Sequence, residues 1–238
     1  TGPNILFIIA DDHRADHLGC AGRDGIDTPA IDGLAKRGVR FDRAYCQGST
    51  SPAVCLPSRA RMISGRSDWT TPDWRAALRG ADFPLWPEIL RDAGWRTHHV
   101  GKWHGGRPWF DRCFEGGSSV LFGGMGSHTT LPVVDVRPDR QDVRRRLAAY
   151  SSDEFADQAV AFIDACATDD DHRPFVLSLS FTAPHDPRTP PAGQPEITAR
   201  AERIDLPPNV LSVHPFDNGE MTIRDEELIS WPRRPADL

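Results

Sequence analysis

The sequence predicts an α/β fold in which a mostly parallel sheet is sandwiched by helices. Strand-like and helix-like segments alternate along the 238 residues, without internal repeats or low-complexity tracts. This alternation favours parallel strands joined by helical crossovers. Residues 5–10 form a continuous apolar run rich in β-branched side chains, which is typical of a strand covered on both faces. We therefore expect this first strand to lie in the centre of the sheet.

Three elements are expected after the first strand. Residues 29–36 predict a short helix, with a threonine before it as a cap and a glycine after it as a stop. Residues 39–45 alternate apolar and polar side chains as a strand does. A helix is expected over 57–64, because a proline suits its first turn and a glycine follows its end.

The second half of the chain repeats this alternation. Residues 87–93 predict a helix and residues 96–102 a strand. The segment from 105 to about 138 is rich in glycine and reads as an irregular binding loop. Residues 153–167 place apolar side chains at helical spacing, and residues 174–181 predict the strand that follows.

Composition limits the kinds of partner. A chain with 39% hydrophobic and 26% charged residues can bury the core of one globular domain. Its net charge of -6 argues against a nucleic acid or an anionic membrane surface as partner. The sequence contains no apolar stretch of membrane-spanning length and no signal segment before the first strand. The compartment stays open between the cytoplasm and a periplasmic or secreted location after processing.

Two adjacent carboxylates, Asp11 and Asp12, follow the first strand directly. In open α/β sheets ligands collect at the carboxyl ends of the strands, where these side chains are expected. Adjacent buried carboxylates are unfavourable unless they are neutralised, and a hard cation such as Ca2+ or Mg2+ does this through oxygen ligands. The alternative is that both residues cap the next helix or are solvated.

Two further predicted strand ends carry side chains that can bind anions or move protons. Lys102 and His104 follow a strand and point to the same side of it, because side chains alternate along an extended chain. A lysine supplies a point charge for a tetrahedral anion, and an imidazole can hold a proton nearby. His185 lies between two prolines after another strand, which suits general acid catalysis on a leaving-group oxygen. Each feature alone also fits an ordinary exposed side chain.

The most specific motif begins at Cys55. Residues 55–59 read Cys-Leu-Pro-Ser-Arg and are followed by Gly65 and Arg66. Taken alone, Cys55 could be a small buried thiol, as most free cysteines are. The motif resembles the maturation signature of type I sulfatases, members of the alkaline phosphatase superfamily, in which the cysteine is oxidised to formylglycine. With the three strand ends in the same order, the resemblance extends over nearly the whole chain.

The resemblance implies a metal ion and a modified residue as cofactors. By this likeness Asp11, Asp12 and Cys55 bind Ca2+ or Mg2+, with Cys55 present as formylglycine. In the family the hydrate of this aldehyde attacks sulfur. The modification also implies a protein partner, which is a formylglycine-generating or other sulfatase-maturing enzyme.

The same resemblance assigns catalytic roles to individual residues. Cys55 is the nucleophile and Arg59 steadies its hydrate, which agrees with the rule that residues four apart share one helix face. Lys102 and His185 grip the sulfate, and His104 contacts the formylglycine and helps to expel the product. The expected activity is that of a sulfuric ester hydrolase acting on a small-molecule or carbohydrate sulfate ester.

The chain departs from the family pattern in its last third. Such sulfatases usually contain a further strand ending in Asp-Asn or Asp-His, another lysine and a smaller C-terminal subdomain. Asp217 and Asn218 read more simply as part of a turn. We therefore interpret residues 1–238 as the N-terminal portion of a sulfatase catalytic domain whose C-terminal part is absent. Weak metal binding and little turnover are expected from this chain alone.

Two segments, 105–150 and 187–238, are expected to form loops on the substrate side, the second with His214 as a possible contact. Side chains of the first segment could line a pocket or simply stabilise the loop; they are Trp109, Phe122, Met125 and His128. Two alternatives to a sulfatase stay open. One is a phosphonate or phosphate ester hydrolase of the same superfamily, and the other is a non-catalytic truncated remnant.

Overall fold

The computed structural model describes residues 2–22, 26–45, 55–67, 69–71, 73–80, 83–139 and 141–193. The predictions made for His214, for Asp217 and Asn218, and for most of 187–238 lie outside this range. The chain divides into two compact units, of which the first comprises Thr1–Asp12 with Cys46–His185 and the second His13–Tyr45 with Asp186–Leu238. None of the described helices is long and apolar enough to span a membrane.

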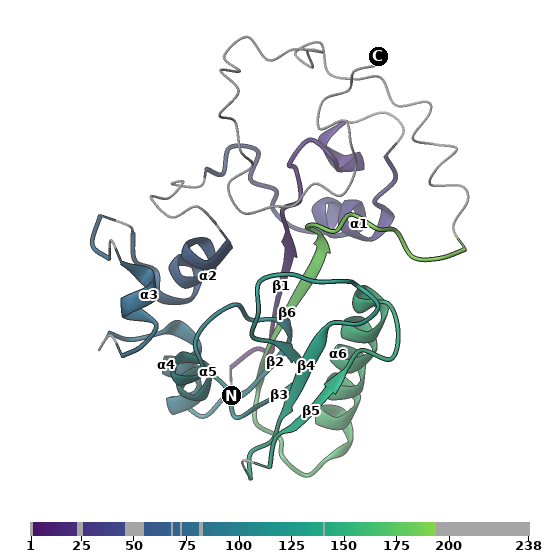
Figure 1. Cartoon of the computed structure of the whole chain (residues 1–238). Helices are drawn as coiled ribbons and strands as arrows, with labels where there is room; N and C mark the ends of the chain where they lie inside the picture. The colour runs from purple at the N-terminus through teal and green to yellow at the C-terminus, as the bar shows by residue number, and fades with distance from the viewer. Residues whose placement is uncertain are drawn as a thin grey trace, which may run out of the picture. The chain divides into compact units, whose positions relative to one another are not determined.

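The first unit is built on a six-stranded sheet with the strand order β1-β6-β2-β3-β4-β5 (Figure 1). Its four neighbouring parallel strands are β1 (Ile5–Asp11), β6 (Phe175–Pro184), β2 (Arg96–Lys102) and β3 (Gly116–Leu121). The antiparallel strands β4 (Pro132–Val136) and β5 (Val143–Arg146) complete it. This arrangement confirms the predicted α/β fold with a mostly parallel sheet.

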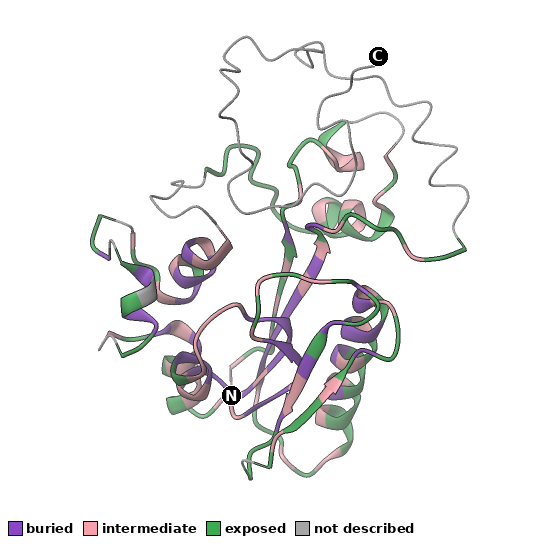
Figure 2. Cartoon of the chain, viewed as in Figure 1, coloured by how far each residue is buried: buried purple, intermediate pink, exposed green. Residues whose placement is uncertain are grey.

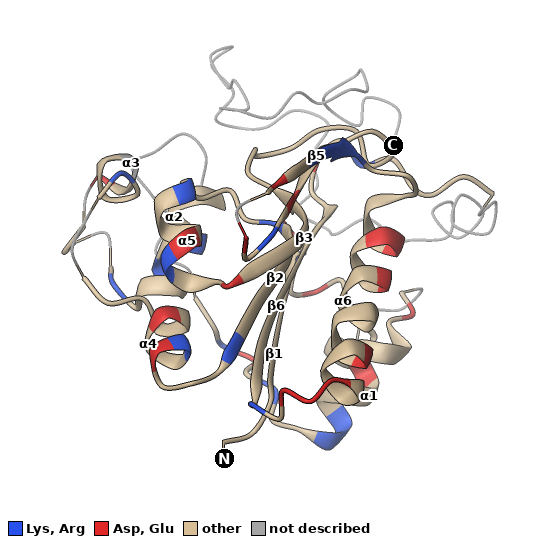
Figure 3. Cartoon of the chain, turned by 90° about the horizontal axis from the view of Figure 1, so that it is seen from below, with Lys and Arg blue, Asp and Glu red and all other residues tan. Residues whose placement is uncertain are grey.

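Helices cover both faces of this sheet (Figures 1 and 3). One face carries four helices: α2 (Cys55–Ser64), α3 (Trp74–Ala77), α4 (Trp86–Asp92) and α5 (Arg107–Cys113). The long helix α6 (Ser151–Thr168) packs on the other face, against β6, β2 and β3. The helices expected over 57–64, 87–93 and 153–167 are therefore confirmed within a few residues at their ends.

Each face of the sheet has its own apolar core. Trp109 of α5 and Val120 of β3 belong to one core. Phe155 of α6 and Leu121 of β3 belong to the other. The consecutive residues Val120 and Leu121 enter different cores because side chains alternate along a strand. Strand β3 is consequently buried on both faces.

The expected central position of the first strand is wrong for the described sheet. Strand β1 lies at the edge and pairs only with β6 among the described strands. Burial alternates along the strand (Figure 2). Leu6 and Ile8 are each 48% exposed. A run of apolar residues indicates that both faces of a strand can be buried, but it does not indicate whether the strand has a neighbour on each side.

The segment 105–138 was predicted to be an irregular loop, and it instead contains α5, β3 and β4. Its glycines misled the prediction because two of them lie inside β3. A Cβ atom on Gly117 would lie 2.8 Å from the carbonyl oxygen of His99 and 2.9 Å from the ring of Phe110. Glycine is required there by close packing, which is one of its established uses within strands.

The second unit contains the short 3-10 helix η1 (Gly19–Ala21) and helix α1 (Pro29–Arg37). Asp32 joins them, since its carboxylate accepts hydrogen bonds from the backbone N–H of Cys20 and the hydroxyl of Thr28, both at 2.8 Å. The helix expected over 29–36 is confirmed. The strand expected over 39–45 is wrong, because these residues form no strand in the structure.

Candidate functional site

Three neighbouring parallel strands bring predicted site residues to one edge of the sheet. Strand β1 ends at Asp11, β2 ends at Lys102, and His185 follows β6 directly. The close approach of β2 to β6 depends on Gly101, because a Cβ atom there would lie 2.1 Å from the carbonyl oxygen of Ser180. The carboxyl edge is where ligands bind in open α/β sheets.

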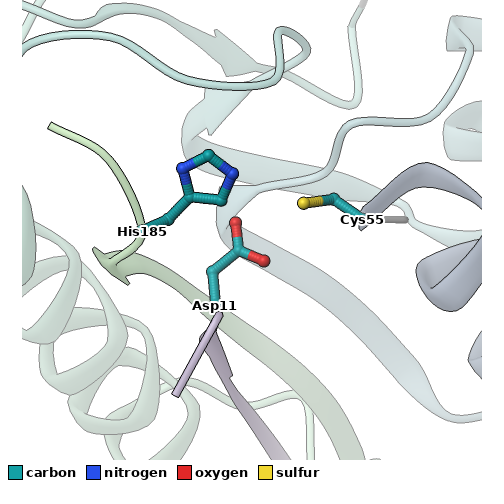
Figure 4. Close-up of side chains that lie close together, drawn as sticks. All are labelled: Asp11, Cys55 and His185. Carbon is teal, nitrogen blue, oxygen red and sulfur yellow. The ribbon is translucent and has the colours of Figure 1, made fainter. Parts of the chain in front are cut away.

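Side chains of Asp11, Cys55 and His185 converge at this edge (Figure 4). One potential ligand atom from each residue lies within 4.8 Å of the other two. Cys55 comes from the first turn of α2, whereas Asp11 is the last residue of β1 and His185 follows β6. Asp11 and His185 are 6% and 3% exposed, so any ligand held between them is largely shielded from water.

The Asp11 carboxylate is held by two cations. Lys102 Nζ forms an ion pair with Asp11 Oδ2, and Arg59 Nη2 lies 3.6 Å from Asp11 Oδ1. Arg59 Nη1 also donates a hydrogen bond of 2.6 Å to the backbone oxygen of Lys102. Burial by itself raises the pKa of Asp11, but Arg59 and Lys102 together outweigh burial and hold that pKa below its ordinary value. Asp11 is therefore ionised at neutral pH.

Two buried nitrogen atoms of the site have no hydrogen-bond partner among the described residues. They are Arg59 Nη2 and His104 Nδ1. Buried polar groups are normally hydrogen-bonded, so two buried nitrogens without a hydrogen bond near Lys102 are suited to an anionic or hydroxyl-bearing ligand. Burial first, and then the charges of Lys102 and Arg59, lower the pKa of His104 to about 4. Its imidazole is uncharged at neutral pH and can accept a proton.

Burial also raises the pKa of the Cys55 thiol, and the nearby carboxylates of Asp11 and Asp12 add to this effect, although Lys102 and Arg59 oppose it. The thiol is therefore neutral at pH 7. Because the thiolate is the nucleophilic form of cysteine, unmodified Cys55 is a poor nucleophile.

The two residues that leave the ends of β1 and β2 adopt an uncommon backbone conformation. Asp12 has a φ of 59° and His104 a φ of 57°. Such values are unfavourable for side chains other than glycine, and they cluster at binding and catalytic sites. Asp12 is exposed, and it is not among the three residues whose ligand atoms converge. The structure thus brings Asp11 and Cys55 together with His185, and it leaves Asp12 exposed.

A buried polar network supports the backbone of His185, and sequence reasoning missed this role. His128 Nε2 lies 3.4 Å from the carbonyl oxygen of His185, and His128 Nδ1 lies 2.8 Å from Ser151 Oγ. Ser151 Oγ is in turn 3.1 Å from Thr182 Oγ1. The three supporting residues come from distant segments and share no motif, so the sequence offered no signal for their meeting.

Residues of the segment 105–150 line a cavity, but only two of the four side chains expected to line a pocket take part. Phe122 and Met125 line a cavity of about 500 Å³ in the first unit. Trp109 and His128, which were also expected there, are 1% and 3% exposed and lie in packed surroundings. Trp109 Nε1 donates to the carbonyl oxygen of Ala77, which fixes the indole within the core.

Comparisons with known proteins agree on one family. A family model described as Sulfatase matches residues 3–206. An N-acetylglucosamine-6-O-sulfatase of Bacteroides thetaiotaomicron is 30% identical over 191 residues, which cover 77% of this chain and 31% of that protein. The human N-acetylgalactosamine-6-sulfatase is 30% identical over 218 residues, covering 78% of this chain and 40% of the relative.

Solved structures give the same result. The structure of BT4656 in complex with its substrate D-glucosamine-2-N,6-O-disulfate superimposes with a TM-score of 0.67 and 26% identity, over 87% of this chain and 39% of that one. The chain thus spans about a third to two fifths of the length of these three proteins.

Proposed function

The chain belongs to the sulfatase family, within the alkaline phosphatase superfamily, and from this premise we propose that the protein hydrolyses sulfate esters. One observation carries the proposal. Cys55, the residue of the maturation motif, lies within 4.8 Å of Asp11 and His185 at a sheet edge where Lys102 and Arg59 add positive charge. A sulfate ester is an anion, so the site offers it both a reacting residue and favourable electrostatics.

We propose that Cys55 acts after conversion to formylglycine by a formylglycine-generating or other sulfatase-maturing enzyme. The converted residue would supply an aldehyde hydrate, one hydroxyl of which can attack sulfur. The raised pKa of the unmodified thiol supports the need for conversion, because a neutral thiol at this position is a poor nucleophile. Arg59 lies four residues later on α2 and would steady the hydrate.

A divalent cation, Ca2+ or Mg2+, fits the donors at this edge. Asp11 is ionised and buried, and Asp12 supplies a second carboxylate beside it. Hard cations prefer oxygen ligands, so residue 55 suits them as an oxygen-bearing hydrate better than as a thiol. Such a cation would supply positive charge against the sulfate oxygens. We therefore propose Asp11, Asp12 and residue 55 as the residues of this chain that hold it.

The remaining side chains bind the sulfate and move protons. Lys102 is completely buried, and its ammonium group lies beside Asp11, where it would contact a sulfate oxygen. His185 would bind the sulfate and protonate the leaving-group oxygen. His104 is uncharged at neutral pH, so its ring can take a proton from residue 55 as the product leaves.

The substrate that we propose is a sulfated carbohydrate. Relatives that are 30% identical are named for sulfate groups on N-acetylglucosamine and N-acetylgalactosamine, and the BT4656 structure contains a sulfated glucosamine. The segment 105–150, which contributes Phe122 and Met125 to a cavity, would contact the sugar. We assign the same role to 187–238, a sequence-based prediction for residues that lie mostly outside the described structure.

Peptide-resolved mass spectrometry on the protein from its native host tests the central step. We expect the tryptic peptide from Ala44 to Arg59 to be lighter by about 18 Da than the cysteine form, as a covalent modification at Cys55 requires. The same sample should release sulfate from a sulfated amino sugar, and a Cys55→Ala variant should not. An intact thiol with no sulfate release would contradict the proposal. Faster cleavage of phosphonate esters than of sulfate esters would reassign the activity.

A further inference from the structure

The cavity in the first unit carries positive charge that the proposed reaction does not use. Its volume is about 500 Å³, and apolar side chains such as Phe122 and Met125 form part of its wall. Arg107, Arg144 and Arg145 also line it. Two of the three arginines come from β5, on which basic residues gather in Figure 3. A cavity with apolar walls and a few charged groups is typical of a small-molecule site.

Only one of these three arginines is free to bind an incoming anion. Arg107 forms an ion pair with Asp142. Arg145 Nε lies 2.8 Å from Asp135 Oδ2. Arg144 is exposed and has no hydrogen-bond or ion-pair partner within the described ranges. The guanidinium of Arg144 therefore gives the cavity an uncompensated positive charge, with a planar fork of donors that matches sulfate or carboxylate.

The cavity borders the proposed sulfate site. Gly105, the residue after His104, and Gly123 both line it. A Cβ atom on Gly124 would lie 3.1 Å from the imidazole of His104, so the loop that follows β3 touches the catalytic imidazole. The wall of the cavity therefore begins next to the site.

Sheet geometry sets the distance between the two positions. Strand β5, which carries Arg144, is three strands away from β2, which carries Lys102. At about 4.8 Å per strand spacing, the lateral separation is roughly 14 Å. This separation of the two strand backbones exceeds the width of one sugar ring, and the ammonium group of Lys102 is directed towards Asp11 of β1, on the side of β2 away from β5. An anion bound at Arg144 would belong to a neighbouring unit of an oligosaccharide.

We propose that Arg144 forms a subsite for a second anionic group, a sulfate or a carboxylate, on an oligosaccharide whose neighbouring unit carries the reacting sulfate. This inference rests on the proposed function. Phe122 and Met125 cover the apolar faces of the sugar between the two charged groups. The subsite makes the protein selective for polyanionic saccharides over singly charged ones.

Binding to a Cys55→Ala variant tests the subsite without requiring turnover. Two oligosaccharides with the same reactive sulfate are compared by isothermal titration calorimetry, one with a sulfate or carboxylate on the next unit and one without. We expect the doubly charged ligand to bind about tenfold more tightly, as a charge-assisted contact provides. Adding Arg144→Gln should abolish this preference, and Arg144→Lys should retain part of it. Separate sulfate and carboxylate ligands identify the preferred group.

Arg79 provides the matched control, because it is an exposed arginine outside the cavity lining. The preference should persist in Arg79→Gln. Equal affinities for both ligands in the Cys55→Ala protein, or a preference that survives Arg144→Gln, would overturn the subsite. Sulfate release from a sulfated amino sugar by the unaltered protein from its native host tests the proposed function separately. A charge preference without any hydrolysis would support the subsite and count against the function.

Discussion

Lys102 and Asp11 depend on each other in the interior of the protein. Lys102 is completely buried, Asp11 is 6% exposed, and the two form an ion pair. Transfer of either charge from water is unfavourable, and their attraction compensates only while both are present. Arg59 lies 3.6 Å from the same carboxylate and gives partial compensation when the lysine is lost.

Replacing Lys102 by Met should lower the free energy of unfolding by about 3 kcal/mol, because a buried carboxylate loses its main partner. Adding Asp11→Asn should recover a large part of this loss, since the unpaired charge is then removed. Urea denaturation of the three proteins measures both effects. Lys36, the only other lysine of the chain, is exposed, so Lys36→Met should change stability little. Equal effects of the two lysine substitutions would contradict this account.

The sequence predicted that Asp11, Cys55 and His185 lie close together because each residue belongs to a pattern that can be recognised locally in the sequence. Asp11 and His185 follow apolar strand runs, and parallel strands place such residues at one edge. Cys55 is part of a motif. The support of His185 by His128 was not predictable, because it depends on hydrogen bonds between segments that carry no local pattern.

The network around His128 makes a testable contribution to catalysis. The hydrogen bonds of His128 to Ser151 and to the His185 carbonyl oxygen hold the backbone of His185, the proposed general acid, in place. His128→Ala should lower kcat by about tenfold with a smaller change in KM, because misplacement of a catalytic group affects the reaction more than binding. Steady-state kinetics on a sulfated sugar measures this.

A conservative variant distinguishes a role of His128 in positioning His185 from a general role in folding. His128→Gln keeps a donor near the His185 carbonyl and should retain more of kcat than His128→Ala. An equal loss in both variants, accompanied by an equal fall in Tm, would mean that His128 is only structural.

At the scale of single elements, β2 contains two histidines that pack tightly, of which His99 is buried and His98 is partly buried. Burial lowers the pKa of His98 to about 4 and of His99 to about 3, and positive neighbours add to the effect in each case. His99 contacts the rings of Trp103, Phe110 and Phe114. Both imidazoles are uncharged in the folded protein over the ordinary pH range.

Acid should therefore destabilise the protein through β2. The unfolded histidines take up protons as the pH falls below about 6.5, whereas the folded ones stay neutral until the pH approaches 4 or 3, so the free energy of unfolding falls with pH. At pH 5 each histidine should contribute a loss of about 2 kcal/mol. His99→Phe keeps an aromatic ring and should reduce the difference in stability between pH 7 and pH 5.

The exposed residue His172 serves as the control for this prediction. Urea denaturation at the two pH values should give the same difference for His172→Gln as for the unaltered protein. An unchanged pH difference in His99→Phe would show that β2 is not a source of the acid sensitivity.

Elements that form through local interactions could be predicted from the sequence, whereas elements that depend on contacts with distant segments could not. Helix α6 and strand β6 were predicted because their own side-chain spacing determines which face is buried. Strand β3 was missed because its glycines are required by contacts with β2 and α5, which lie elsewhere in the chain. The position of β1 at the sheet edge depends on which strands exist beside it, and this information is absent from residues 5–10.

At the scale of the whole molecule, the described sheet has an apolar edge. Leu6 and Ile8 of β1 are each 48% exposed on one face of this edge strand. Long exposed apolar edge strands promote association with other chains. The described residues alone therefore form a surface that natural proteins usually cover.

The proposed cation site has few candidate ligands among the described residues. Ca2+ takes six to eight oxygen ligands, and Asp11, Asp12 and a hydrated residue 55 can supply only part of this number. The relatives extend to more than twice the length of this chain, since it covers 31% and 40% of two of them. Residues 1–238 expressed alone, together with a maturing enzyme, should bind Ca2+ only in the millimolar range, as weak sites with few charged ligands do.

Isothermal titration calorimetry with Ca2+, on a sample whose folding is confirmed by circular dichroism, measures this affinity. Asp11→Asn should abolish the remaining binding, whereas Asp157→Asn, a change at an exposed position of α6, should leave it intact. The same sample should release little sulfate, because a weakly held cation cannot stabilise charge on the sulfate oxygens. Micromolar Ca2+ affinity with strong, Ca2+-dependent sulfate release from residues 1–238 would show that these residues already contain a complete catalytic centre.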